Sequence, residues 1–340
     1  MSATSPGELP AAREARRGSA ELPAGPGGPA PWSGLLFVDK PAGVTSHDVV
    51  DRARRRLRAP GAGHLGTLDP GACGLLILAL GAATRCAAVW QSGAKTYEAT
   101  MRFGVVTSTQ DLQGDVLERH EVALEERQVR EAASRLLGEI EQVPPMVSAL
   151  KVGGRRLHRL ARQGLTVERR PRRVHVHAWE WLAFAWPEAS FRVVVSGGTY
   201  VRTLAHDLGA VLGPGAALKS LRRLRSEPFG LERAATWRDL DELAPGEVLR
   251  RAGLPLADAL RLLPVVVLDR AGAEALGFGR RPAVEPGAAP VKGGLRSVVF
   301  FGPGEEPLAL GELEPDPMRP GGLLACPHVV FPWAVRQGKP

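Results

Sequence analysis

The chain has 340 residues and a formal net charge of +8 at pH 7, and it is long enough for two domains with cores of their own. Its three cysteines, Cys73, Cys86 and Cys326, contain no Cys-x-x-Cys pair, which argues against a disulfide framework and a zinc site and fits a reducing cytosol. The longest apolar run, near Leu75 to Ala83, is too short to span a bilayer, and the first residues lack a signal-peptide pattern. We therefore expect a cytoplasmic protein without a membrane segment.

The chain begins with residues 1–31, which are rich in Ala, Pro, Gly, Glu and Arg and are expected to be disordered. A strand at 35–38 is expected to open the folded part, and Ser46 is expected to cap the helix that follows. This helix carries Val49, Val50, Ala53 and Leu57 on one face. Strands are expected next at 75–80 and 96–103, followed by a helix over 129–137 that Gly138 ends. Paired strands at 174–186 and 190–196 and a helix over 201–212 that stops at Gly213 complete this part.

Strands and helices mix here without regular βαβ alternation, which favours an α+β fold: a mixed, largely antiparallel sheet with flanking helices. Gly and Pro residues at 245–255 suggest a domain boundary. Short apolar runs after this point predict a small β-rich domain, with strands at 264–269, 297–301, 308–310 and 329–331 and a helix at 271–276. The expected domains are a disordered extension at 1–31, a main domain at 32–255 and a β-rich domain at 262–335.

The positive charge is concentrated in residues 151–173, which hold nine basic residues and one acidic residue, a net +8. Clustered arginines are typical of proteins that bind a polyanion, because they neutralise phosphates and release counterions. A solvated helix face is the alternative explanation. Two smaller basic clusters lie at 52–58 and 219–225.

The most informative motif is the glycine-rich loop Gly63–Gly74, which holds His64 and Asp69 five residues apart. The purely structural interpretation is a turn in which the Asp69 side chain forms an Asx-type hydrogen bond with nearby backbone amides. The whole string, Gly-His-Leu-Gly-Thr-Leu-Asp-Pro, resembles the catalytic loop of bacterial-type tRNA pseudouridine synthases that act on the T-loop uridine, the TruB family. Further segments match this family in order, from about Leu35 to Phe229: 36–46, 95–99, 144–151, 198–204 and 221–224.

The resemblance implies a role for each matched residue. Asp69 is then the catalytic nucleophile, Arg202 its ion-pair partner, and Tyr97 the tyrosine whose ring packs on the target base and whose hydroxyl takes the C5 proton. Tyr200 and Leu221 are implied to line the uracil pocket, and His64 to enter the RNA beside the flipped base. Taken alone, Arg202 is an ordinary helix arginine, Tyr97 a core tyrosine, His64 a loop histidine, and Leu221 a helix core residue spaced with Leu218 and Leu224.

Making pseudouridine breaks the bond from N1 to C1′ and joins C5 to C1′, with no net redox change. The reaction therefore needs no cofactor, and the chain has no Rossmann or P-loop fingerprint. Attack by Asp69 at C1′, attack at C6 and assistance of a glycal all stay open. No second ligand stands near His64 at a metal-site spacing, so no metal is expected.

The implied partner is the T stem-loop of tRNA, bound by a monomer. Its backbone would be held by basic residues of the 151–173 segment, namely Lys151, Arg155, Arg156, Arg159 and Arg162. By position, the C-terminal β-rich domain resembles the RNA-binding module of the PUA type that many family members carry. Two other functions remain: a guide-RNA-dependent synthase of the dyskerin type, and a tRNA-folding protein that has lost catalysis.

Overall fold

A computed structural model describes residues 24–25, 28–29, 32–148, 151–152, 155–156, 165, 167–284 and 296–335. Residues 1–30 and 31–340 form two separate units. The disorder expected of residues 1–31 falls mostly outside the described residues, which include here the antiparallel pair β1 (Ala24–Gly25) and β2 (Gly28–Pro29). All elements below belong to the second unit.

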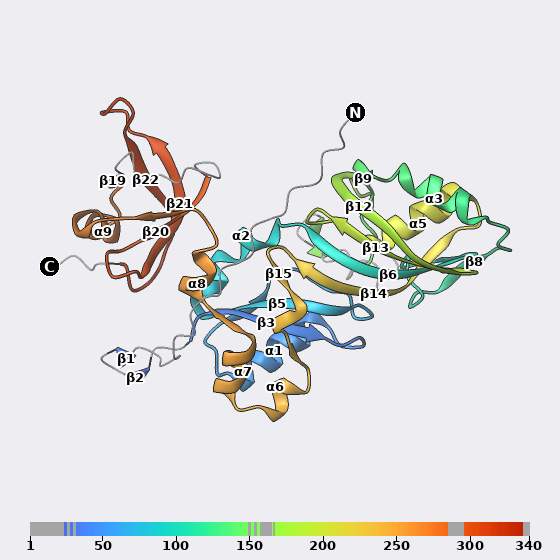
Figure 1. The fold of residues 1–340 in the computed structure, drawn as a ribbon, viewed down its shortest axis with the longest axis horizontal. Coiled ribbons are helices and arrows are strands. Elements are labelled where there is room, and N and C mark those ends of the chain that lie inside the picture. Colours follow the sequence, from blue (N-terminus) through green and yellow to red (C-terminus); the bar gives the residue numbers. More distant parts are fainter. Residues whose placement is uncertain are drawn as a thin grey trace, which may run out of the picture. The chain divides into compact units, whose positions relative to one another are not determined.

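A large mixed sheet dominates the first part of this unit (Figure 1). In the described residues its strands run in the order β16–β3–β5–β14–β6–β13–β12–β9, with β15 beside β14, β17 beside β3 and β4 beside β5. Only the pairs β14–β5 and β16–β3 are parallel among these described strands. The strand bounds are β3 Gly34–Lys40, β4 Ala62–His64, β5 Cys73–Leu80, β6 Lys95–Phe103, β9 Gly138–Gln142, β12 Arg172–Ala185, β13 Glu188–Val195, β14 Ala216–Ser226, β15 Phe229–Gly230, β16 Ala235–Thr236 and β17 Gly253–Pro255.

Helices cover this sheet because its central strands are apolar on both faces. In β3, Leu36 and Val38 join one core cluster, whereas Leu35 and Phe37 join another, as the two-residue period of a strand requires. In Figure 1, α1, α6 and α7 lie together near β3, and α3 lies beside α5 near β12 and β13. The helix bounds are α1 Ser46–Arg56, η1 Gly81–Cys86, α2 Ala87–Gln91, α3 Glu126–Ser134, α5 Val201–Leu212, η2 Leu231–Arg233, α6 Asp239–Glu242, α7 Pro245–Ala252 and α8 Leu256–Leu260.

Two short antiparallel pairs stand apart from the large sheet: β7 (Val105–Thr107) with β8 (Val116–Arg119), and β10 (Lys151–Val152) with β11 (Arg155–Arg156). A second sheet follows α8, in the order β18–β20–β21–β22–β19. Its elements are β18 Val265–Val267, α9 Arg270–Gly277, β19 Ala283–Val284, β20 Arg296–Phe301, β21 Pro307–Pro315 and β22 Leu323–Val330. The predicted α+β class, with a mixed sheet, flanking helices and a C-terminal β domain, is therefore confirmed.

Three local predictions are wrong. Helix α1 is capped by Thr45, not by Ser46, because the Thr45 side chain and Asp48 form a reciprocal capping box. Helix α3 ends at Ser134 and not at Gly138, which is the first residue of β9. The amides of residues 135–137 bond to carbonyls three residues earlier, as in a 3₁₀ turn, so the α-helix does not continue. Leu221 lies on strand β14, so the alternative of a helix core residue does not hold.

Candidate active site

The loop that carries Asp69 connects β4 to β5 and is held from one side by the start of α1. The Ser46 hydroxyl donates to the carbonyl of Leu68 and accepts from the Leu68 amide, both at 2.9 Å. The amide of Gly43 donates to the carbonyl of Pro70 at 2.8 Å. These contacts fix the backbone on both sides of Asp69.

Two buried cations hold the same loop from beneath. Lys40 Nζ donates to the carbonyls of Val44 at 2.7 Å and Pro70 at 3.3 Å, and burial lowers the pKa of this amine to about 8. Arg223 donates to the carbonyls of Leu75 at 2.7 Å and Gly66 at 3.0 Å. Because each guanidinium or ammonium donor meets a backbone carbonyl, the burial of these charges is offset by hydrogen bonds.

Asp69 forms an ion pair with Arg202, which lies on the first turn of α5. Arg202 Nη2 lies 3.1 Å from Oδ1 of Asp69 and 2.7 Å from the carbonyl oxygen of Val147. The Arg202 side chain is 3% exposed, whereas that of Asp69 is 39% exposed, so the carboxylate faces open space above a buried guanidinium. Arg202 also lies near a second carboxylate, with Nη1 at 3.6 Å from Oδ2 of Asp111.

Opposing influences act on the Asp69 carboxyl. Burial raises its pKa, and the neighbouring charge of Asp111 adds to this rise, while Arg202 and Lys40 lower it. The net direction is upward. Arg202 is therefore the main group that favours the ionised form of Asp69 against the effect of burial.

A cavity of about 420 Å³ opens above this ion pair. It is lined by all six residues that the sequence assigned to catalysis and to uridine binding, namely His64, Asp69, Tyr97, Tyr200, Arg202 and Leu221. They come from four stretches of the chain: His64 and Asp69 from the end of β4 and the loop that follows it, Tyr97 from β6, Tyr200 and Arg202 from the start of α5, and Leu221 from β14. The arrangement provides a carboxylate, a paired guanidinium and two aromatic rings around one concave space.

Tyr97 and Tyr200 are held in different ways. Tyr97 is 6% exposed and lies on β6 in the main core cluster. Tyr200 precedes α5, and the buried amide of Gln142 brackets its backbone, accepting from its amide at 3.0 Å and donating to its carbonyl at 3.2 Å. Burial raises the pKa of the Tyr200 hydroxyl, and its hydrogen bond with Ser148 opposes that rise.

The structure adds residues to this cavity that the sequence analysis did not single out. Lys95 lines it, is bound to the carbonyls of Gln91 and Gly93, and has a pKa lowered by burial to about 8. Arg223 and Ser148 line it as well. Asp111 reaches Arg202 from the loop between β7 and β8, where an acidic residue in a polar turn gives no local signal of such a role.

The residues predicted to bind the RNA backbone are only partly described. Lys151, Arg155 and Arg156 lie on β10 and β11, but their side chains fall outside the described residues. Arg159 and Arg162 fall outside them entirely. Arg172, from the same basic segment, lines the cavity above Asp69.

Comparison with known proteins decides the family. Residues 54–201 match the model of the TruB family pseudouridylate synthase N-terminal domain, and residues 202–261 match that of the tRNA pseudouridylate synthase B C-terminal domain. The chain belongs to the TruB family. It is therefore an isomerase, as the sequence predicted, and the TruB-type cavity above Asp69 is its candidate active site.

Individual relatives agree with the family model. The chain is 49% identical over 249 residues to tRNA pseudouridine synthase B of Burkholderia mallei (strain NCTC 10247), covering 73% of this chain and 82% of that protein. It is 39% identical over 294 residues to the protein of that name from Syntrophotalea carbinolica, covering 86% of this chain and 90% of that protein. Among solved structures, it is similar to a chain of a Cbf5–Nop10–Gar1 complex, with a TM-score of 0.68, 31% identity, and coverage of 89% and 87% of the two chains. No helix among the described residues is long and apolar enough to cross a membrane.

Proposed function

We propose that this TruB-family chain isomerises a uridine in the T loop of tRNA to pseudouridine, with Asp69 as the nucleophile. The observation that carries the proposal is the ion pair between Asp69 and the buried Arg202 at the base of a cavity of about 420 Å³. A nucleophilic carboxylate must be ionised, and a guanidinium fixed by a backbone carbonyl stabilises that form without moving. The relatives named tRNA pseudouridine synthase B support tRNA as the substrate.

The other cavity residues then have separate tasks. Tyr97 packs on the uracil ring and its hydroxyl takes the C5 proton, while Tyr200 and Leu221 enclose the detached base. His64 enters the RNA and fills the place that the flipped uridine leaves in the stack. The bond from N1 to C1′ breaks, the bond from C5 to C1′ forms, and the proton from C5 is exchanged for one at N1. Atoms and electrons balance without a cofactor or a metal.

The remaining parts of the chain are proposed to hold the RNA. The basic 151–173 segment, including Lys151, Arg155, Arg156, Arg159 and Arg162, grips the backbone of the T stem-loop. The domain at 262–335 acts as a PUA-type RNA-binding module beside a catalytic domain at 32–255, and residues 1–31 are an extension. The protein works as a monomer in the cytoplasm.

The test is a modification assay with purified chain and an unmodified tRNA transcript, in the absence of any guide RNA, followed by mapping of pseudouridine at each position. The expected product is one pseudouridine in the T loop. A matched transcript with cytidine in place of that uridine should remain unmodified. Modification only when a guide RNA is added would favour the dyskerin-type alternative, and RNA binding without any pseudouridine would favour the tRNA-folding alternative.

A further inference from the structure

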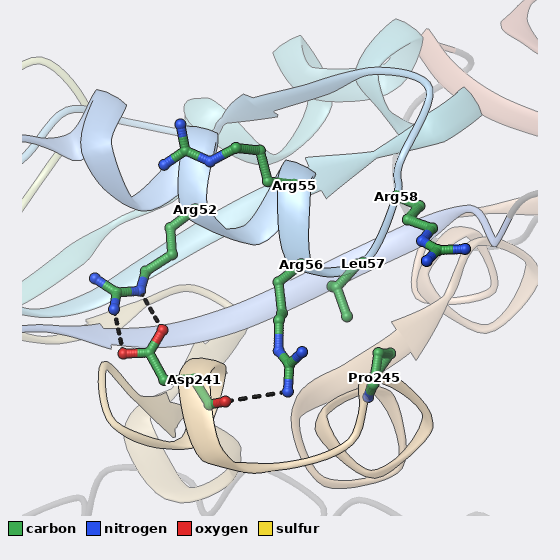
Figure 2. A pocket seen from close by; sticks show the side chains of 7 residues that line it. All are labelled: Arg52, Arg55, Arg56, Leu57, Arg58, Asp241 and Pro245. Atoms are coloured by element: carbon green, nitrogen blue, oxygen red, sulfur yellow. Dashed lines mark hydrogen bonds and ion pairs between the residues drawn. The ribbon is translucent and has the colours of Figure 1, made fainter.

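A second cavity, of about 780 Å³, lies at the end of α1 and is rich in arginine. It is lined by Arg52, Arg55, Arg56, Leu57, Arg58, Asp241 and Pro245. In Figure 2, Arg52 and Arg56 point toward the segment of Asp241, whereas Arg55 extends from the other side of α1. None of these residues lines the cavity above Asp69. The TruB-type active site therefore does not account for this basic cavity.

Two of its arginines form a rigid wall. Arg52 is paired with the carboxylate of Asp241, with Nε at 2.6 Å from Oδ1, and its guanidinium lies over the ring of Trp237, 4.0 Å from the centroid. Arg56 donates to the carbonyls of Leu240, Asp241 and Leu243 at 2.9 to 3.1 Å. Figure 2 shows the contact between Arg56 and Asp241. These contacts preorganise two of the cavity's cations.

The other two arginines, Arg55 and Arg58, are exposed and have no hydrogen bond or ion pair from their side chains within the described part of the chain. Asp241, the acidic residue of the lining, is already engaged by Arg52. The cavity also borders Pro245, the first residue of α7, whose cap residue Ala244 has no hydrogen-bonding side chain and whose first turn carries Glu247. The unpaired cations of Arg55 and Arg58 favour an anion at this place.

The cavity is held at a fixed spacing from the active site. Ser46, at the first turn of α1, contacts the loop of Asp69, whereas Arg55 and Arg56 lie in the last turn of the same helix. Arg52 lies one turn earlier, and Arg58 follows the helix end. At a rise of about 1.5 Å per residue, the ten residues from Ser46 to Arg56 span about 15 Å. A polyanion bound in the cavity above Asp69 can reach this distance with its own backbone, whereas a single small anion cannot contact both places.

We propose that the arginine cavity of Arg52, Arg55, Arg56 and Arg58 is a second phosphate-binding site, which holds backbone phosphates of the same tRNA whose uridine enters the cavity above Asp69. This inference rests on the proposed function, because it assumes that tRNA is the substrate. Arg52 and Arg56 shape the site, and Arg55 and Arg58 supply the free guanidinium groups that pair with phosphate.

The variants that test it are Arg55→Gln and Arg58→Gly. Arg55 lies on an exposed helix face without a partner, and Gln is a good helix former, so folding should be preserved. Arg58 has a φ of 51°, a left-handed conformation that glycine adopts without strain, so its replacement removes charge without straining the backbone. The matched control is Arg54→Gln, which removes the same charge from the same turn but does not line the cavity.

The measurement is the affinity of each variant for an unmodified full-length tRNA transcript over a series of salt concentrations. Each backbone phosphate that an arginine no longer neutralises should lower the log–log salt slope by roughly 0.7 to 0.9. Between about 1 M and 0.1 M salt the logarithm of the salt concentration changes by one unit. Over that range this difference in slope corresponds to a fall in affinity, relative to the parent, of roughly five- to eightfold for each such phosphate. Arg55→Gln and Arg58→Gly should show this change, the double variant about twice the change, and Arg54→Gln the parent's slope.

The inference is overturned if Arg55→Gln and Arg58→Gly bind tRNA with the same salt slope as Arg54→Gln. Failure of the proposed function has a different signature, because the parent protein itself would then form no pseudouridine in the same transcript. A parent that modifies the transcript, together with variants that bind it like the control, rejects the second phosphate site alone.

Discussion

Nη2 of Arg202 lies 3.1 Å from each carboxylate oxygen of Asp69. The same nitrogen donates to the carbonyl of Val147 at 2.7 Å, so the guanidinium is fixed by the backbone before it meets the carboxylate. With Arg202 buried and Asp69 partly open, the free side of the carboxylate faces the cavity. The pair thus orients a charged group toward the place where substrate would lie.

The first prediction concerns Asp69→Asn. The amide keeps the size of the side chain but cannot supply an ionised carboxylate, so pseudouridine formation should be abolished while tRNA affinity changes little. Single-turnover assays and a binding titration on the same transcript measure both quantities. Turnover equal to that of the parent would remove Asp69 from the role of nucleophile.

The second prediction concerns Arg202→Lys. Lysine keeps the charge but lacks the planar group that contacts Asp69 and the Val147 carbonyl together, so the single-turnover rate should fall by about 10²-fold or more with little change in affinity. A variant with normal chemistry at saturating RNA but weak binding would mean instead that Arg202 contacts phosphate.

The third prediction is a shift in the pH profile of Asp111→Asn. Burial and Asp111 raise the pKa of Asp69, and only its ionised form is a nucleophile, so the rate should fall as the pH falls through this raised pKa. Removing the charge of Asp111 lowers the pKa of Asp69, and the acid limb of the profile should move to lower pH. Asp115→Asn, an exposed aspartate of the same loop, is the control and should leave the limb in place. A limb that stays fixed in Asp111→Asn, or moves upward, contradicts the electrostatic assignment.

The fourth prediction tests the basic 151–173 segment. Replacing Arg155, Arg156, Arg159 and Arg162 together by Gln should weaken tRNA binding and lower the log–log salt slope by roughly 0.7 to 0.9 for each phosphate that these arginines neutralise in the parent. Chemistry at saturating RNA should be nearly unchanged. A salt slope equal to that of the parent would indicate a solvated surface at this segment.

Sequence patterns predicted this fold well where local periodicity decides the structure. The alternating Tyr97, Ala99, Met101 and Phe103 lie on one face of β6 in the main core, and α5 ends at Gly213, which has a φ of 105°. Helix ends were harder to predict, because a capping box depends on which of two adjacent hydroxyl residues meets Asp48. Strand β14 was not predicted, because the three-residue spacing of Leu218, Leu221 and Leu224 fits a helix. Its strand conformation depends on pairing with β5 and β6, which are distant in the sequence.

Some residues of the candidate site could be predicted from the sequence, and others could not. A resemblance over several motifs named the six residues that line the cavity above Asp69, although each of them taken alone has an ordinary structural explanation. Asp111 and Lys95 were not named, because their positions beside Arg202 and beneath the cavity depend on three-dimensional packing. The basic cluster at 52–58 was visible as charge, yet only the fold separates the fixed Arg52 and Arg56 from the unpaired Arg55 and Arg58.

The last prediction concerns Arg223, which holds the Asp69 loop through the carbonyls of Leu75 and Gly66. Arg223→Lys keeps the charge but cannot donate to both carbonyls in the same geometry, so the loop should lose part of its anchorage, at a cost of roughly 1–3 kcal/mol in stability. The single-turnover rate should fall about tenfold or more, because a misplaced nucleophile loses its alignment with the sugar, whereas tRNA affinity should hold. Arg222→Lys is the matched control, since the Arg222 side chain is 40% exposed and pairs with Asp39 at 2.7 Å. It also contacts Sγ of Cys73 at 3.6 Å, at the start of β5 where the loop ends. If Arg223→Lys instead lowered affinity at an unchanged rate, Arg223 would be an RNA contact and the loop would be positioned by Lys40, Ser46 and Gly43 without it.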